Sequence, residues 1–95
     1  MTAFLIADIE VTDPVGFDEY KRLANDTITA YGGKYVVRGG DFEVLEGDWS
    51  PRRIVILEFP SMSSLKAWYD SPEYAPLKRI REMSANSRFV IVEGL

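Results

Sequence analysis

The hydrophobic pattern of the chain begins with the period of a strand and then changes to that of a helix. Residues 3–11 (AFLIADIEV) are apolar and β-branched over a length that suits a strand. Asp13 followed by Pro14 is typical of a helix N-cap with proline at the first helical position. Aromatic and aliphatic residues then recur every three or four positions as far as Tyr31, and the glycine pair 32–33 supplies a left-handed stop. We therefore predict a strand followed by one long helix.

The second half of the chain repeats this alternation. Residues 34–38 (KYVVR) and 52–59 (RRIVILEF) predict two strands, and residues 42–46 (FEVLE) are expected to continue the first of them after a glycine break. The segment between them, 47–51 (GDWSP), predicts the loop of a hairpin. Helices are predicted over 62–69, after a Ser61 cap, and from about residue 72 to about residue 84. Residues 88–93 (RFVIVE) predict the last strand.

The resulting order, β-α-β-β-α-β, is the split βαβ arrangement of the α+β, ferredoxin-like fold. Right-handed crossovers then give an antiparallel four-stranded sheet of strand order 4-1-3-2, with the helices on one face. The other face is also apolar, since the two-residue period places on it Phe4, Ile6, Val36, Ile54 and Ile56. We expect one domain over residues 1–95 that forms a homodimer through this sheet face.

Composition excludes several kinds of chemistry. The formal net charge of −4 argues against nucleic acid or an acidic membrane surface as a partner. The absence of cysteine and histidine removes disulfides, thiolate chemistry and the commonest metal and haem ligand. No carboxylate spacing resembles a calcium or magnesium site, so we expect no metal and no cofactor. The N-terminus lacks a basic segment and no apolar run approaches the ~20 residues of a membrane span, which favours a cytoplasmic protein.

Three charged residues are candidates for chemistry because the strand period places them on the apolar outer face. Arg38 and Glu58 are expected to lie close together across the hairpin. They are either a structural ion pair, or a site in which Arg38 binds an anionic ligand and Glu58 orients it or transfers a proton. Asp8 is a candidate general base if desolvation raises its pKa, and is otherwise a solvated residue at the mouth of a barrel.

The turn WYDSPEY at 68–74 holds the densest aromatic group of the chain. Its rings either pack the second helix against the sheet, or present the hydroxyl of Tyr69 or Tyr74 to a ligand carbonyl. Both tyrosines are therefore candidate ligand-binding residues.

Several segments occur together in an order that resembles a known family. They are GGKY (32–35), RGG (38–40), LEGDW (45–49), RIVILEFP (53–60) and WYDSPEY (68–74), with Arg81 and a closing VEG (92–94). In this order the chain is similar to the domain of unknown function number 1330, within the dimeric α+β barrel superfamily. The resemblance implies a homodimer in which two sheets close face to face, and it implies no established activity. The superfamily includes small monooxygenases, isomerases of lactone intermediates and haem-dependent members, and the absence of histidine argues against haem.

Three functions remain open at this stage. The first is a small cofactor-free oxygenase or isomerase that acts on an aromatic or lactone-like molecule, which rests on analogy of fold. The second is a non-catalytic module that binds a small molecule, and the third is a dimeric interaction protein without a pocket. A cavity of about 300 Å³ or more that the charged residues reach would favour the first two.

Overall fold

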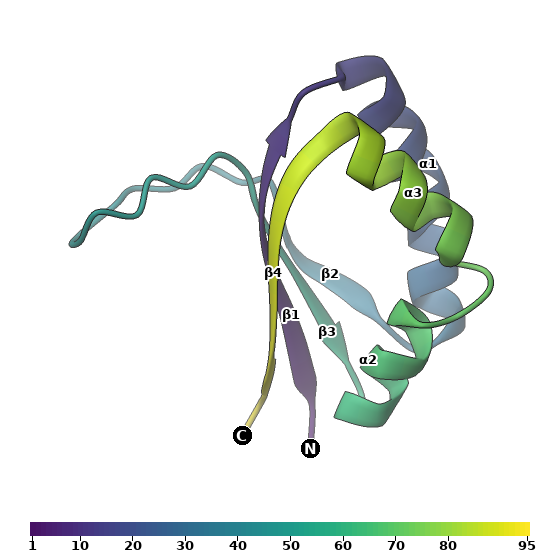
Figure 1. Cartoon of the computed structure of the whole chain (residues 1–95). Coiled ribbons are helices and arrows are strands. Elements are labelled where there is room, and N and C mark those ends of the chain that lie inside the picture. The colour runs from purple at the N-terminus through teal and green to yellow at the C-terminus, as the bar shows by residue number, and fades with distance from the viewer.

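One antiparallel sheet and one layer of helices make up the computed structural model, which describes residues 1–95 (Figure 1). The strand order is β2-β3-β1-β4, which is the predicted order 4-1-3-2 read from the other edge. All helices lie on the same face of the sheet, which we call the inner face, and the opposite face is the outer face (Figure 1). The elements in chain order are β1 (Ala3–Val11), α1 (Pro14–Ala30), β2 (Lys34–Arg38), β3 (Ile54–Phe59), α2 (Met62–Tyr69), α3 (Ala75–Ser84) and β4 (Ala85–Glu93). The α+β, ferredoxin-like prediction is confirmed.

The helices begin where the sequence places their caps. The Asp13 carboxylate accepts a hydrogen bond from the Gly16 N–H at 3.3 Å, at the start of α1. The Ser61 hydroxyl accepts a hydrogen bond from the Ser64 N–H at 3.1 Å, and the Ser64 hydroxyl accepts one from the Ser61 N–H at 3.3 Å. Gly32, with φ at +82°, follows α1 in the left-handed region that favours glycine. These local signals explain why the element order could be predicted.

Alternation along β1 separates the two faces of the sheet. The side chains of Ala3, Leu5, Ala7 and Ile9 are at most 3% exposed and pack beneath the helices. Their neighbours on the outer face, from Phe4 to Glu10, are half-buried. This division matches the prediction for the strand.

No helix of the structure is both long enough and apolar enough to cross a bilayer.

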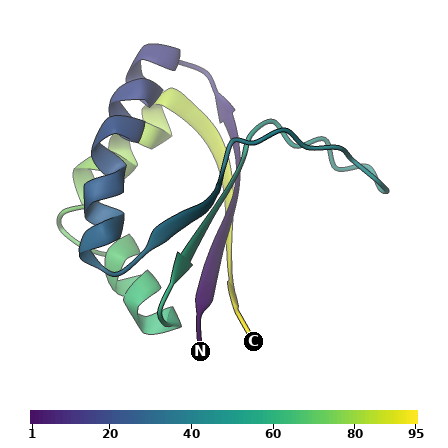
Figure 2. The same cartoon turned by 180° about the vertical axis from the view of Figure 1, so that it is seen from behind.

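The prediction of a strand over residues 42–46 is wrong. The chain between β2 and β3, residues 39–53, leaves the sheet as a projecting arm that forms no ladder (Figure 2). The side chains of Phe42, Val44 and Leu45 are 42%, 50% and 90% exposed. A β-branched and aromatic pattern favours a strand only where a neighbouring strand pairs with it, and the two halves of the arm run beside each other without the hydrogen bonds of a ladder (Figure 2). The remaining differences are shifts of element ends, since β3 begins at Ile54, α3 at Ala75 and β4 at Ala85.

A β-bulge in β2 corrects the predicted position of Arg38. Lys34 lies opposite Glu58 and Tyr35 opposite Leu57, but the register then shifts so that Arg38 lies opposite Val55. The extra residue, Val36, changes the phase of the alternation. Arg38 therefore projects from the inner face, whereas Glu58 remains on the outer face. The predicted Arg38–Glu58 pair does not form.

Candidate functional site

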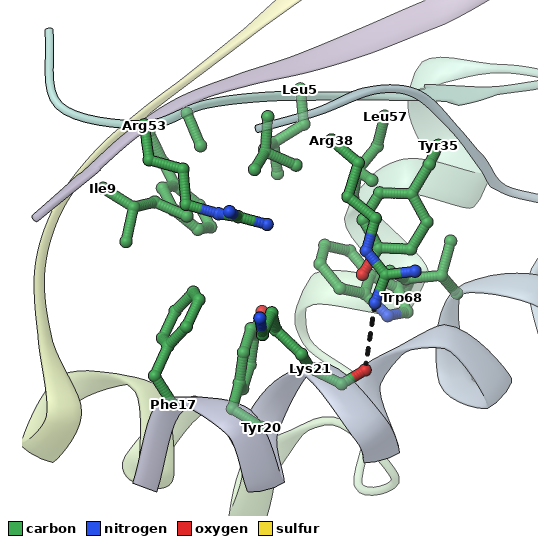
Figure 3. A pocket seen from close by; sticks show the side chains of 14 residues that line it. Leu5, Ile9, Phe17, Tyr20, Lys21, Tyr35, Arg38, Arg53, Leu57 and Trp68 are labelled. Atoms are coloured by element: carbon green, nitrogen blue, oxygen red, sulfur yellow. Dashed lines mark hydrogen bonds between the residues drawn. The ribbon is translucent and has the colours of Figure 1, made fainter. Parts of the chain in front are cut away.

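A cavity lies between α1 and the inner face of the sheet, and Figure 3 shows the side chains around it. Eleven of its 14 lining residues are hydrophobic, and they come from α1, from all four strands and from α2. Its free volume is about 30 Å³. Because one water molecule needs roughly 10–15 Å³ on this measure, the cavity as it stands has room for about two.

Two arginine side chains reach this apolar space. Arg38 comes from the end of β2; its Nη2 donates to the Lys21 carbonyl oxygen at 3.3 Å, and its guanidinium lies 4.3 Å from the centre of the Tyr35 ring. Arg53 comes from the residue before β3, and its guanidinium lies 5.8 Å from the centre of the Phe17 ring. Figure 3 shows both guanidinium groups directed from the sheet toward α1. Each group thus contacts an aromatic face rather than an acid.

Neither guanidinium has a carboxylate partner. The ion pairs of the structure are Lys21–Asp18 at 3.2 Å and Arg52–Glu10 at 3.7 Å, and both lie on exposed side chains. The Nε of Arg53 is enclosed and has no hydrogen-bond partner. Buried donors are normally satisfied, and each exception calls for an explanation. The cavity is therefore a positively charged and largely apolar space in a chain whose net charge is negative.

The backbone at Gly39 permits this placement of Arg53. Gly39 has φ at +69°, and its N–H donates to the Ile54 carbonyl oxygen at 2.8 Å. A Cβ at this position would overlap the Nη1 atom of Arg53. Glycine here lets the backbone turn in the left-handed region and lets the guanidinium approach the main chain closely.

Three buried polar side chains form a network behind the cavity. The hydroxyl oxygens of Tyr20 and Tyr74 are 2.7 Å apart, and Arg81 Nε donates to the Tyr74 hydroxyl at 3.3 Å. Trp68, which is fully buried, packs against Tyr74 with 4.2 Å between ring centres. Burial raises the pKa of Tyr20 and of Tyr74, so both hydroxyls remain protonated at neutral pH.

Burial also raises the pKa of Tyr35, although the charge of the nearby Arg38 opposes the effect. Of the tyrosines that line the cavity, Tyr20 and Tyr35 can therefore donate a hydrogen bond to a ligand oxygen without ionising.

Asp8 lies on the outer face and is held by the base of the arm. Its carboxylate accepts hydrogen bonds from Trp49 Nε1 at 2.9 Å and from the Arg52 N–H at 2.8 Å. Partial burial alone would raise the pKa of Asp8, but these donors outweigh burial and lower it. The raised pKa on which a general base at Asp8 depended is absent, and Asp8 serves to anchor the arm.

Of the five candidate residues taken from the sequence, only Arg38 lines the cavity. Asp8 and Glu58 lie across the sheet from it, and Tyr74 lies behind it, in contact with the lining residues Tyr20 and Trp68. Tyr69, at the end of α2, lines grooves beside β4 instead, and the Lys78 ammonium lies 3.7 Å from its ring centre.

Sequence reasoning missed three residues that the structure places at the cavity. Arg53 shares the two-residue period of Val55 and Leu57, so the pattern did hold a signal for a charge on the buried face. Tyr20 lies on the apolar stripe of α1, where its hydroxyl could have been noted. Tyr35 precedes the bulge and lies opposite Leu57 on the inner face, so the two-residue period held a signal for it as well.

The site offers little to a metal ion. No group of three or more histidine, cysteine, aspartate or glutamate side chains lies close enough together to hold one. The donors that face the cavity are guanidinium, ammonium and phenol groups, which bind anions and carbonyl oxygens rather than cations.

Solved structures with the same fold include proteins of unknown function and oxygenases. A protein of unknown function from Rhodopseudomonas palustris superposes with a TM-score of 0.79 at 20% identity, covering 99% of this chain and 82% of that one. A dimeric ferredoxin-like protein of unknown function from Jannaschia sp. CCS1 gives a TM-score of 0.73 at 14% identity, with coverages of 99% and 100%. SnoaB, a cofactor-independent oxygenase from Streptomyces nogalater, gives 0.70 at 8% identity, with coverages of 99% and 93%. At these identities the likeness is one of fold.

The family assignment rests on the sequence of the chain rather than on its fold. None of the curated proteins matches it at a significant level. The family model described as a domain of unknown function matches residues 2–95, which is almost the entire chain. The protein belongs to the DUF1330 family, as its sequence motifs indicated.

Proposed function

We propose that the protein binds a small aromatic molecule with an ionisable hydroxyl in the cavity between α1 and the sheet, and promotes its oxygenation without a cofactor. One observation carries the proposal: Arg38 and Arg53 reach an apolar cavity without any carboxylate to neutralise them. The Nε of Arg53 is enclosed and unpartnered, which costs stability, so a ligand that supplies the missing negative charge is the simplest explanation.

The arginines would act by ionising the bound molecule. A unit charge about 4 Å from a guanidinium gains about 4 kcal/mol at an effective dielectric constant near 20, which corresponds to roughly three pKa units. Arg38 is exposed and so contributes less than this. Burial raises the pKa of a bound phenol, as it does for Tyr35, so the phenol ionises near neutral pH only if its oxygen contacts both guanidinium groups. The cavity then needs no protein base.

An electron-rich phenolate can reduce dioxygen directly. The phenolate transfers one electron to dioxygen, and the two radicals combine at a ring carbon that carries hydrogen to form a peroxide anion. This anion takes up from water the equivalent of the proton that the phenol released, which gives a hydroperoxide. Loss of water from the hydroperoxide gives the quinone, so one oxygen atom enters the product and the other leaves as water. The substrate supplies all the electrons, and no other reductant is needed. The shared fold with a cofactor-independent oxygenase supports this assignment by analogy.

Isomerisation of a lactone is less well supported. Such a reaction moves a proton between carbon atoms and needs a general base of suitable pKa. No carboxylate lines the cavity, and its tyrosines have raised pKa values because of burial.

An aromatic ligand is larger than the cavity, so the cavity must open toward the β4 edge before the ligand can bind. Leu5 and Phe89 line the cavity, and they also line an adjoining groove of about 240 Å³ beside α2. Phe89 is half-buried on the edge strand β4. A rotation of its side chain would join the two spaces into a pocket near the lower end of ligand-site volumes, roughly 300 Å³.

Oxygen consumption tests the proposal directly. Naphthols should show a phenolate absorbance on binding and consume dioxygen, and Arg38→Met and Arg53→Met should each lower the rate at least tenfold. Arg52→Met is the matched control, because its side chain is on the outer face and exposed. Binding without oxygen uptake would support a non-catalytic binding module instead. Absence of both would contradict any small-molecule function of this cavity.

We also propose that the chain is a homodimer through its outer face. Half-buried Phe4, Ile6, Ile54 and Ile56 are joined there by the more exposed Val90 and Val92 of β4. The dimeric neighbour from Jannaschia, with the same fold, supports this arrangement. The exposed apolar residues of the arm, such as Phe42, add to the surface that a second copy would cover.

A further inference from the structure

A second groove, which shares Phe89 with the cavity, lies between α3 and β4. The groove has a free volume of about 380 Å³. Its lining residues are Tyr69, Arg81, Glu82, Ala85, Asn86, Ser87 and Phe89. It therefore combines two aromatic rings with a guanidinium, and it is large enough for a small organic molecule.

Arg81 is the unusual residue of this groove. Its side chain is only 6% exposed, yet it has no carboxylate partner in the structure. Its Nε–H donates to the Tyr74 hydroxyl at 3.3 Å, and its guanidinium lies 4.2 Å from the centre of the Phe89 ring. The two Nη groups make no hydrogen bond within the chain and are not enclosed, so their donors remain available from the groove.

The position of Arg81 in the fold explains why its guanidinium stays charged, but not why its two Nη groups lack hydrogen-bond partners. It lies in the last turn of α3, where the helix carbonyl groups favour a cation. Burial by itself would lower the pKa of Arg81, but contact with the Tyr74 hydroxyl outweighs burial and raises it. The guanidinium therefore stays charged although it is nearly buried, and its two Nη groups have no hydrogen-bond partner.

We propose that this groove binds a small molecule in which one carboxylate is attached to an aromatic body. The two Nη groups match the geometry of a carboxylate, with which a guanidinium forms two parallel hydrogen bonds. Tyr69 and Phe89 offer apolar ring surfaces to the aromatic body. Glu82 lines the same groove and repels a second negative charge, which favours a monoanion over a phosphate dianion. The site does not depend on the proposed oxygenation, because its ligand contacts neither Arg38 nor Arg53.

Benzoate is a suitable probe for this site, and amide shifts in two-dimensional NMR of the full chain can follow its binding. We expect saturable shifts at residues 85–89 at millimolar benzoate. Arg81→Lys keeps the charge but removes the two-pronged geometry, and it should weaken binding at least fivefold. Arg79→Lys, an exposed arginine on the same helix, is the matched control and should leave binding unchanged. Glu82→Gln alters an exposed side chain, leaves the fold intact and should tighten binding two- to fivefold.

Three results would overturn the proposal. One is the absence of saturable shifts at residues 85–89. Another is benzoate binding that Arg81→Lys and Glu82→Gln leave unchanged but that Arg38→Met abolishes, which would assign the ligand to the cavity. The third is inorganic phosphate binding more tightly than benzoate at the same residues, which would show that the ligand class is wrong. If Arg81→Lys fails to fold, the Glu82→Gln result alone decides between support and rejection.

Discussion

Replacing Arg53 with methionine should stabilise the protein, although it removes a side chain that we place in the binding cavity. The Arg53 Nε is enclosed and has no hydrogen-bond partner, and an unsatisfied buried donor costs about 1–3 kcal/mol. Methionine keeps most of the apolar length of the side chain. The substitution also loses the contact with the Phe17 ring at 5.8 Å, which is worth roughly 0.5–1 kcal/mol. The net gain should be about 1 kcal/mol, or roughly 4–8 °C in Tm for a domain of this size.

Urea unfolding at one fixed protein concentration measures this change, since the stability of a dimer depends on concentration. Arg52→Met is the matched control, because the neighbouring side chain is 69% exposed and pairs weakly with Glu10 at 3.7 Å. Its effect should stay within about 0.5 kcal/mol. If Arg53→Met lowers the free energy of unfolding by more than about 1 kcal/mol with an unchanged m value, Arg53 is a structural residue. An anionic ligand would then no longer be needed to explain the position of Arg53.

Three further predictions test other parts of the structure. Ile56→Glu puts a charge on the apolar outer face and should give a monomer or an aggregate, whereas a wild-type mass of 10.8 kDa by light scattering would refute the dimer. Gly39→Ala strains the backbone at φ +69° and displaces Arg53, so it should weaken naphthol binding at least threefold; unchanged binding would mean that Arg53 does not contact the ligand. Burial raises the pKa of Tyr20 and Tyr74, so the folded protein keeps protons that the unfolded chain releases above about pH 10. Stability should therefore be level below that pH and fall above it, and a urea midpoint that stays constant from pH 9 to 11 would contradict the buried hydroxyl pair.

The sequence was sufficient for the fold because its local signals agree with one another. The cap at Asp13, the glycine after α1 and the two-residue period of β1 each indicate the element that the structure contains. The projecting arm could not be predicted in this way. Residues 42–46 have the composition of a strand, but a strand also needs a partner, and no local pattern reveals whether one is present.

The candidate site was less predictable, because one inserted residue reverses which face a side chain occupies. The bulge at Val36 has no distinctive residue type, since valine fits a regular strand equally well. Arg38 was therefore expected beside Glu58 and is found on the other face. Arg53 was predictable in principle, because its period matches that of the buried Val55, but a charge at the start of a strand is usually taken as solvated.

The bulge at Val36 connects the two functions that we propose for the sheet. Without the extra residue, Arg38 would lie on the outer face opposite Ile54, where a dimer partner would have to bury its charge. Burying an unpaired charge costs several kcal/mol, and even a well-paired one often adds little stability. With the extra residue, the outer face keeps its apolar surface for a partner, and Arg38 reaches the cavity to face Tyr35 and the helix α1. A single irregularity in β2 thus removes a charge from the proposed interface and supplies it to the proposed ligand site.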